Sequence, residues 1–449
     1  MKYVGIIAEN SFEYVESLLS IWNDDNVAVL IDWRLPIEQI QNSLIKANVS
    51  KCYIWCELTK IINSLKKNNN NIEICCISCL NNKYNDLPIA VREKYHDNYT
   101  DNAAIIFFSS GTTGKSKGVI LTHSAIQKNA DAIIKYMQPS SNDSISIVKS
   151  LSHSSTLVGE LLVGLKASIP IYMTRTILSP SEALRWMNKT KTTILCLNPT
   201  LLQLYTFAAY KIQMIYLKKI YVSGSVLSVE LQSRARNIFK QVKIFNVYGL
   251  TEAGPRVTAQ MEKSYNKLGT VGRAINGVRV RIIDANGKTA KLGELGTIHV
   301  ATPSIFSKYL QQENTNKFEW LNTGDFGYID IEGDLYVVGR KDDMIVHGAY
   351  NIYPLYIENI ICGFSFIEDC IVFGIPDELY GSKICCMYMC VNSDVNKQLM
   401  YDLCKNKLAS YEIPNFFIQV PSLPMTVGGK KSRNAALKLY YDLERRDNI

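Results

Sequence analysis

Apolar and amphipathic segments alternate through the first three quarters of this 449-residue chain. Short runs rich in Val and Ile, each closed by turn residues, predict buried strands; they are YVGIIAE, NVAVLID, KCYIWC, AAIIFFSS, TTILCLN, KKIYVSG and KIFNVYG. Helical patterns lie between several of them, for example SPSEALRWMNKT, whose Ser-Pro start suits a helix N-terminus. Strands and helices in alternation predict an α/β fold with largely parallel sheets.

The pattern changes near residue 269. The segments VGRAINGVRVRIIDANGKTAKLGELGTIHVA and GDFGYIDIEGDLYVVGRKDDMI alternate polar and apolar positions around tight turns, which is typical of antiparallel hairpins. We therefore expect a large N-terminal domain over residues 1–341, built of α/β subdomains plus a β-barrel-like hairpin region. Residues 342–449 mix strands and helices and predict a small α+β C-terminal domain. Residues 63–102 are the most loop-like part of the first half.

The composition is that of a globular protein, with 47% hydrophobic and 20% charged residues. The formal net charge of +8 favours anionic ligands such as nucleotides, CoA or an acidic carrier protein. No basic run carries interleaved aromatic residues, which argues against a nucleic-acid partner. Residues 1–10 contain no hydrophobic targeting core, and no apolar stretch approaches the ~20 residues of a membrane span. We expect a soluble, cytoplasmic protein.

Twelve cysteines raise the question of a metal site. Only Cys76 and Cys79 have Cys-x-x-Cys spacing, and the five histidines are scattered. A structural zinc site needs a second such pair or suitably spaced histidines. We therefore interpret the cysteines as reduced and mostly buried.

The segment SSGTTGKSKG, residues 109–118, is dense in glycines, hydroxyls and lysines and predicts a phosphate-binding loop. A P-loop needs a glycine five positions before Gly114, but Ser109 stands there and Gly111 is only three positions away. The segment must therefore hold phosphate in another way.

Further polar groups lie at or near the ends of predicted strands. They occur in NVYGLTEAG, NTGDFG, GRKDD and PMTVGGKKSR, as Thr251, Glu252, Asp325, Arg340, Asp342 and Lys430. The set contains a metal-capable carboxylate, a ribose-capable carboxylate and two cationic groups far apart in sequence. That inventory suits a nucleoside triphosphate with its metal.

These motifs resemble, in order and separation, those of the adenylate-forming superfamily of acyl-CoA synthetases, peptide-synthetase adenylation domains and luciferases. SSGTTGKSKG is similar to the phosphate-loop signature of that family, with Ser116 where proline is usual. YGLTE, TGD, GRKDDMI, NIYP and PMTVGGK follow in the family order, and NVAVLIDWRLP extends the resemblance over nearly the whole chain. The resemblance implies ATP, Mg²⁺ and CoA, or the phosphopantetheine of a carrier protein, as cofactors.

The family forms an acyl-adenylate by attack of a carboxylate on the α-phosphorus of ATP, with pyrophosphate leaving. The resemblance implies that Thr251 bonds the α-phosphate, that Glu252 holds Mg²⁺ and that Lys117 neutralises phosphate charge. The β- and γ-phosphates would be wrapped by a loop whose glycines allow close approach, formed by Ser109, Ser110, Gly111, Thr112, Thr113 and Gly114.

For the nucleoside, the resemblance implies that Asp325 accepts from the ribose hydroxyls, Arg340 contacts ribose or phosphate, and Tyr248 lies against adenine. Lys430 would reach from the small domain to bridge the carboxylate and the α-phosphate in the transition state. Asp342 matches the hinge about which a mobile C-terminal domain rotates between adenylation and acyl transfer.

Simpler interpretations exist for these residues. Glu252 and Asp325 could be surface carboxylates, and Arg340 could belong to a turn-stabilising ion pair. Lys430 could belong to a solvated charge cluster, but the spacing Gly-Lys-x-x-Arg, which ends at Arg433, selects it.

The acyl pocket is expected among HSST, NPTLL, SGSV and AGPR, and the resemblance implies that it includes His153, Ser154, Ser223, Gly224, Ser225 and Gly249. A structural role is the alternative for His153. Amino-acid-activating members carry an Asp at the position of Ser154, and a buried ammonium without that partner would be costly. We therefore expect a neutral aliphatic or aromatic carboxylic acid. Arg256 could meet a second anionic group on it.

Three functions remain open. Thioester-forming members thread pantetheine past a glycine-rich turn, which here keeps Gly348 but has Ala349 where a second glycine is common. The first interpretation is an acyl-CoA synthetase. The alternative is a stand-alone ligase that loads an acyl carrier protein, whose acidic surface would suit the basic segment KKSRNAALK. The third is a nucleotide-binding module without catalysis, which predicts loss of Lys430, Glu252 or the loop hydroxyls, and all of these are present.

Overall fold

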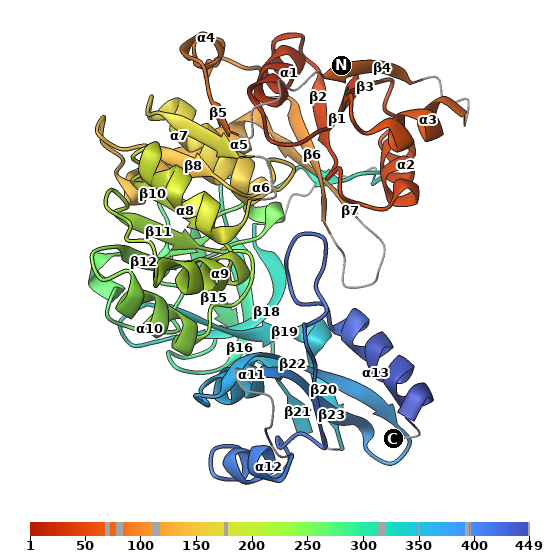
Figure 1. Cartoon of the computed structure of the whole chain (residues 1–449), viewed down its shortest axis with the longest axis vertical. Coiled ribbons are helices and arrows are strands. Elements are labelled where there is room, and N and C mark those ends of the chain that lie inside the picture. Colours follow the sequence, from red (N-terminus) through yellow and green to blue (C-terminus); the bar gives the residue numbers. More distant parts are fainter. Residues whose placement is uncertain are drawn as a thin grey trace.

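The structure is a computed structural model of the chain. It describes residues 1–67, 72–77, 84–109, 117–174, 178–312, 319–348, 350–390, 395 and 397–447. A large body carries the N-terminus, and a smaller one below it carries the C-terminus (Figure 1). The expected boundary at residues 341 and 342 falls in the 3-10 turn Lys341–Asp343, between strands of different sheets.

The first sheet of the large domain comprises β1 (Tyr3–Ile7), β2 (Val27–Leu30), β3 (Lys51–Trp55), β4 (Glu73–Ile77), β6 (Ala103–Ser109), β7 (Lys117–Thr122) and β17 (Lys308–Tyr309). Its order in the described part of the chain is β17-β7-β6-β2-β1-β3-β4. The strands from β6 to β4 are parallel, whereas β6, β7 and β17 pair antiparallel. β2 is buried along its whole length, as its unbroken apolar run predicts.

The second sheet comprises β5 (Tyr84–Asp86), β8 (Ile145–Ile147), β9 (Ile171–Thr174), β10 (Ile194–Leu197), β11 (Lys219–Val222), β12 (Lys243–Tyr248), β13 (Thr258–Ala259) and β14 (Arg273–Ala274). Its order is β14-β13-β12-β11-β10-β8-β9-β5, with a parallel centre and antiparallel edges. The carboxyl ends of these parallel strands share one edge, so the residues after β10, β11 and β12 come together.

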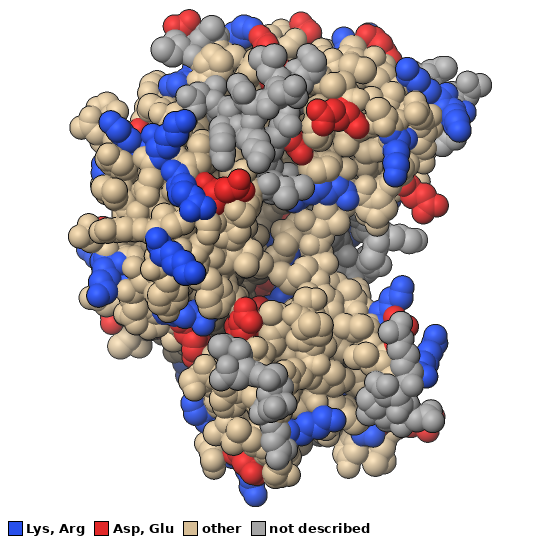
Figure 2. Space-filling model, viewed as in Figure 1, with Lys and Arg blue, Asp and Glu red and all other residues tan. Residues whose placement is uncertain are grey.

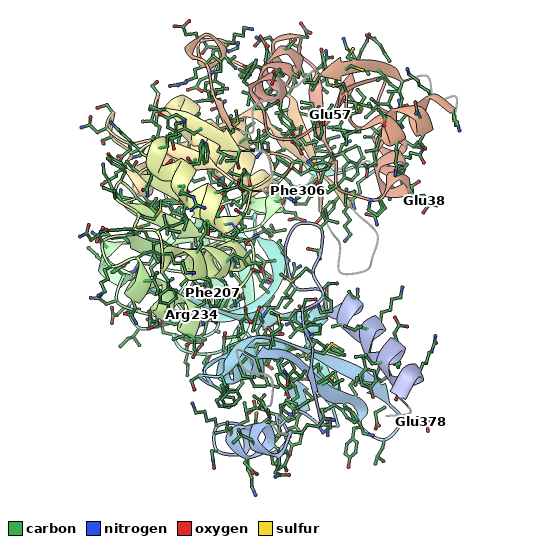
Figure 3. The ribbon with its side chains drawn as sticks, viewed as in Figure 1. Glu38, Glu57, Phe207, Arg234, Phe306 and Glu378 are labelled. Atoms are coloured by element: carbon green, nitrogen blue, oxygen red, sulfur yellow. The ribbon has the colours of Figure 1, made fainter. Side chains whose placement is uncertain are left out.

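Helices pack on both sheets. In the large domain they are α1 (Phe12–Asn23), α2 (Ile37–Lys46), α3 (Thr59–Lys67), α4 (Ile89–Arg92), α5 (His123–Met137), α6 (Ser154–Thr156), the buried π-helix η1 (Leu157–Leu162), α7 (Val163–Lys166), α8 (Pro180–Lys189), α9 (Pro199–Ala209) and α10 (Val229–Ile238). α8 begins with a capping box between Ser179 and Glu182, with proline at its start, as its sequence predicts. Phe207 of α9 and Arg234 of α10, labelled in Figure 3, form a cation–π contact at 5.5 Å.

The hairpin region forms a four-stranded antiparallel sheet in the order β15 (Arg279–Ile283), β16 (Gly296–Ala301), β18 (Leu321–Ile329) and β19 (Leu335–Arg340). The small domain contains the hairpin β20 (Ile345–His347) and β21 (Tyr350–Ile352), and a sheet of β22 (Ile367–Asp377), β23 (Gly381–Cys390) and β24 (Phe416–Gln419). Its helices are α11 (Pro354–Cys362), α12 (Lys397–Lys405) and α13 (Arg433–Asp447). Hydrophobic clusters of its own lie on the two sides of the latter sheet.

The described part of the segment 63–102, which was expected to be loop-like, contains β4, β5 and α4 as well as the end of α3. The described cysteines are free, and six of them are buried. In the described ranges, no helix has the length and apolar character to cross a membrane.

Candidate active site

A buried carboxylate with two side-chain partners lies in β18. Asp325, which is 7% exposed, accepts a hydrogen bond from the Tyr248 hydroxyl at 2.5 Å and another from Arg340 Nε at 3.0 Å. Its backbone N–H donates to Thr323 Oγ1. Burial raises the pKa of Asp325, and the Arg340 charge opposes that rise. The three residues expected around the nucleoside are therefore brought together from β12, β18 and β19.

The turn that follows β12 carries Thr251 and Glu252. Thr251 Oγ1 lies 2.8 Å from the Oγ of Ser154, the first residue of α6. Glu252 Oε1 accepts a hydrogen bond from the Tyr309 hydroxyl at 3.2 Å, and Lys117 Nζ lies 5.3 Å from the centre of the same ring. Tyr309 thus connects the expected metal carboxylate with the lysine at the end of the phosphate loop.

The phosphate loop joins β6 to β7. Its expected residues Ser110, Gly111, Thr112, Thr113 and Gly114 lie outside the described residues, as does the side chain of Ser109. Ser109 and Lys117 are paired across the β6–β7 hairpin, which fixes the two ends of the loop side by side. Because Lys117 lies over Tyr309, the loop ends beside the tyrosine that bonds Glu252.

The protein supplies few ligands to a metal ion at this place. Within the described ranges, no group of three His, Cys, Asp or Glu side chains could hold a metal. Mg²⁺ usually takes one or two carboxylates and completes its shell with substrate phosphates and waters. A single carboxylate, Glu252, beside a phosphate loop therefore fits a magnesium ion that enters with ATP.

A hairpin from the small domain reaches this site. The segment 424–431, here called the Lys430 hairpin, is closed by an antiparallel bridge and rises from the lower body just before α13 (Figure 1). Thr200 Oγ1 donates a hydrogen bond to Gly429 O at 3.1 Å. A Cβ on Gly428 would lie 3.4 Å from His153 Cε1. The tip of the hairpin is therefore seated on the large domain, at α9 and His153.

Figure 2 shows a hollow between the two bodies of the molecule. Lys430 is exposed. A Cβ on Gly224 would lie 3.9 Å from Lys430 Cε. The surrounding protein displaces part of the hydration of the Lys430 ammonium group. That loss is the main cause that lowers the pKa of Lys430; Arg340 adds to it, while Asp325 and Glu252 oppose it. Lys430 is thus within electrostatic reach of both carboxylates.

The neighbouring lysine points into the small domain instead. Lys431 Nζ lies 2.9 Å from Asp369 Oδ1, donates to Cys370 O at 2.7 Å and lies 3.8 Å from Glu358 Oε2. Burial alone would lower the pKa of Lys431, but the two carboxylates outweigh burial and raise it. Lys430 and Lys431 therefore have different surroundings in the structure, a difference that could not be predicted from the sequence alone.

The expected hinge residue Asp342 is exposed in the turn after β19. Its neighbour Asp343 accepts a hydrogen bond from Arg433 Nη1 at 3.1 Å. The arginine of the Gly-Lys-x-x-Arg motif therefore forms a bond within the small domain. Gly348 has a φ of +61°, which favours glycine. Ala349 lies outside the described residues.

Three expected acyl-pocket residues, Ser223, Gly224 and Ser225, follow β11. Ser223 is buried, and its Oγ has no hydrogen-bond partner in the described part of the chain. Gly224 has a φ of +96°, and Ser225 is exposed. Gly249 follows β12, where a Cβ would lie 1.9 Å from Pro255 O. That close backbone approach excludes every residue other than glycine.

His153 has a structural partner. Its Nε2 lies 3.4 Å from Asp32 Oδ2, and Asp32 also accepts hydrogen bonds from Arg34. Burial would raise the pKa of Asp32, but the bonds from Arg34 and the proximity of His153 hold it well below its usual range. His153 thus joins β2 to the Lys430 hairpin, at the rim of the expected acyl pocket.

Sequence reasoning missed Tyr309, Asp32 and Asn129. Asn129 of α5 donates to Arg256 O at 2.9 Å and accepts from Arg256 N at 3.0 Å, which fixes the loop after Glu252. Asp32 lies just beyond the end of β2, and a polar residue after a parallel strand is a signal that could have found it. Tyr309 and Asn129 lie in segments without such a signal.

Comparison with known proteins agrees with this architecture. The AMP-binding enzyme family matches residues 2–310, and the AMP-binding enzyme C-terminal domain matches residues 356–430. The uncharacterized acyl–CoA ligase YhfT of Bacillus subtilis is 30% identical over 333 residues, which are 74% of this chain and 67% of the relative. A 2-succinylbenzoate–CoA ligase of Enterococcus faecalis is 25% identical over 444 residues, 96% of this chain and 87% of the relative.

Among solved structures, an anthranilate CoA ligase, AuaEII, in complex with anthranoyl-AMP has a TM-score of 0.87 at 21% identity, covering 98% of this chain and 88% of the other. The fold is shared. The chain belongs to the AMP-binding enzyme family, the adenylate-forming superfamily that the sequence motifs resemble. It is an acid–thiol ligase of the acyl-CoA synthetase type, and ATP, Mg²⁺ and CoA are the cofactors of the CoA ligases in this family.

Proposed function

We propose that the protein is an AMP-forming carboxylate–CoA ligase whose substrate is a carboxylic acid without an ammonium group. The observation that carries the proposal is that the Lys430 hairpin is seated on the large domain: Thr200 Oγ1 donates to Gly429 O at 3.1 Å, and Lys430 Cε would lie 3.9 Å from a Cβ on Gly224. There the charges of Asp325 and Glu252 act on Lys430 and oppose the lowering of its pKa. A cation at this place would stabilise the negative charge that grows as a carboxylate attacks a phosphate.

In the first step, a carboxylate oxygen of the acid bonds to the α-phosphorus of ATP, and the bond from that phosphorus to the pyrophosphate oxygen breaks. Asp325, held by Tyr248 and Arg340, would accept from the ribose hydroxyls and orient the nucleotide. Thr251 would donate to the α-phosphate, while Ser154 holds its hydroxyl in place. Lys430 would stabilise the charge that builds between the two reactants.

Magnesium, held by Glu252 and the phosphates, would draw charge off the leaving pyrophosphate. Tyr309 orients that carboxylate through its hydrogen bond to Oε1. In the second step, the sulfur of CoA bonds to the acyl carbon, the bond from that carbon to the phosphate oxygen of AMP breaks, and the thiol proton is released. The glycine turn at Gly348 would let pantetheine pass.

Position 154 carries serine and not an acidic residue, which supports a substrate acid without an amino group. The Ser154 hydroxyl is already engaged with Thr251, so it offers an ammonium group no charged partner. A buried ammonium without one would be costly.

CoA is supported over a carrier protein as the acceptor. The basic segment KKSRNAALK would suit an acidic carrier only if its charges were free. Lys431 is bound to Asp369, and Arg433 to Asp343 and Glu358, inside the small domain. Two cations of this segment are therefore already paired within the small domain and are not free to bind a carrier protein.

The test is pyrophosphate release from ATP and Mg²⁺ over a panel of alkyl, aryl and amino acids, each with and without CoA. We expect release with acids that lack an amino group, and multiple turnovers only with CoA. A single turnover despite CoA would indicate a carrier-protein acceptor. No release with any acid, together with retained ATP binding, would favour the binding-only module.

A further inference from the structure

A charged side chain in the AGPR segment, which is expected to belong to the acyl pocket, is buried without a full set of partners. Arg256 is 2% exposed and is among the largest fully buried side chains of the protein. Its Nε and Nη2 have no hydrogen-bond partner in the described part of the chain. Buried charges in folded proteins are nearly always paired. The guanidinium group therefore needs an explanation beyond packing.

The two unpartnered nitrogens are the ones that bind a carboxylate side-on. The N–H bond of Nε and one N–H bond of Nη2 run parallel on one edge of the planar guanidinium group, and a carboxylate accepts both at once. A glycine faces this part of the group, because a Cβ on Gly159 would lie 3.1 Å from Nη2. Gly159 belongs to the buried π-helix η1, a type of helix that occurs frequently at functional sites.

The charges around Arg256 do not balance. The nearby acidic group is Glu160, also in η1 and 0% exposed, and Lys149 Nζ lies 3.0 Å from its Oε1. Burial raises the pKa of Glu160 to about 7, with Lys149 and Arg256 opposing, so this carboxyl group is only partly ionised near neutral pH. Two buried cations thus share at most one negative charge.

This group of charges is connected to the reaction site. Arg256 and Thr251 lie in the same loop after β12, which Asn129 fixes by hydrogen bonds to the backbone of Arg256. Lys149, the partner of Glu160, is close enough to Lys430 to contribute to the lowering of its pKa. The uncompensated positive charge therefore lies in the same loop as Thr251 and within electrostatic reach of Lys430.

We infer that the acyl substrate carries a second anionic group, a carboxylate, which binds the Nε–Nη2 edge of Arg256 while the first carboxylate is adenylated. This inference rests on the proposed function and refines it. A second carboxylate would supply the missing negative charge and two acceptors. It would also fix which end of the substrate faces Lys430.

The test compares acids matched in length. Adipate, its monomethyl ester and hexanoate form one set, and 4-(2-carboxyphenyl)butanoate and 4-phenylbutanoate form another. The full-length protein is assayed for pyrophosphate release with ATP, Mg²⁺ and CoA. We expect kcat/KM for the dicarboxylate to exceed that for its matched acids by roughly 10- to 100-fold, the range of a charge-assisted hydrogen-bonded contact. Equal kcat/KM within both sets would overturn the inference and leave the proposed function intact.

Variants then assign the preference to Arg256. We expect Arg256→Met to lose the preference for dicarboxylates, so that kcat/KM for each dicarboxylate falls relative to its matched acids. Arg279→Met, at a position whose side chain is 65% exposed, is the matched control and should leave kcat/KM unchanged for every acid in both sets. Should Arg256→Met not fold, Gly159→Ala places a methyl group beside Nη2 and should raise KM for dicarboxylates alone. An equal loss with every acid in a folded variant would refute the role of Arg256. No release with any acid would remove the proposed function and this inference together.

Discussion

Replacing each of the two adjacent lysines by alanine should produce opposite results. Lys430 is exposed, so its removal should change the free energy of unfolding by less than about 0.5 kcal/mol. Loss of a group that stabilises developing charge typically lowers kcat by 10²–10³. We therefore expect Lys430→Ala to reduce the rate of adenylation about 100-fold or more in a fully folded protein.

Lys431→Ala should act on stability instead. Its ammonium group makes an ion pair at 2.9 Å with Asp369 and a hydrogen bond at 2.7 Å with Cys370 O. A hydrogen bond to a charged group contributes about 1.5–3 kcal/mol. Because the Lys431 side chain is 25% exposed, the low end applies and gives a loss of about 2 kcal/mol. For a domain of about 100 residues, that loss lowers Tm by roughly 8–16 °C.

The assay is pyrophosphate release at 25 °C under saturating ATP and Mg²⁺, with Tm measured on the same samples. The expected result is a slow, stable Lys430→Ala and an active, less stable Lys431→Ala. The reasoning would be refuted if Lys430→Ala lowered Tm as much as Lys431→Ala. A 100-fold slower Lys431→Ala that stays folded at 25 °C would refute it as well.

Three further predictions concern the same site. Asp325→Asn should raise KM for ATP by roughly 10- to 100-fold, because the ribose loses a charged acceptor; kinetics at varied ATP would show this, and an unchanged KM would contradict it. Thr200→Val should slow adenylation by about 2- to 10-fold with unchanged Tm, because the hairpin loses its bond to Gly429 O. Burial raises the pKa of Glu160 from 4.5 to about 7, so the stability that this group contributes is fully present below pH 4.5 and is lost as pH rises to 7. The loss is on the order of 3 kcal/mol, and Glu160→Gln should remove that slope from urea unfolding curves measured across this range.

The strands and their parallel pairing were predictable because they depend on local pattern. Runs such as Val27–Leu30 and Ile194–Leu197 are apolar at every position, and both are central, fully buried strands. The antiparallel hairpins of Arg279–Ile283 and Gly296–Ala301 likewise follow from alternation and turn residues. Each of these patterns spans about ten residues, so it can be recognised in the local sequence.

The partners of the site residues were not predictable in this way. Asp325 and Tyr248 are motif residues, but the hydrogen bond between them joins strands of different sheets. The burial of Arg256 depends on η1 and α5, which lie far from it in the sequence. The different surroundings of Lys430 and Lys431 depend on where the hairpin lies between two domains. Motif order identifies which residues matter, whereas their chemistry depends on neighbours that only the fold supplies.

The distribution of bonds favours the proposed hinge at Asp342. The Lys430 hairpin and α13 are tied to the interior of the small domain by charged bonds, from Lys431 to Asp369 and from Arg433 to Glu358. Two bonds that seat this domain on the large one have uncharged donors: Thr200 Oγ1 donates to Gly429 O, and Gln203 Nε2 donates to Glu368 O. Neutral bonds of this kind contribute about 1 kcal/mol each, less than the charged ones. We therefore propose that the small domain leaves the adenylation site as a unit and carries Lys430 with it, because the weaker bonds break first.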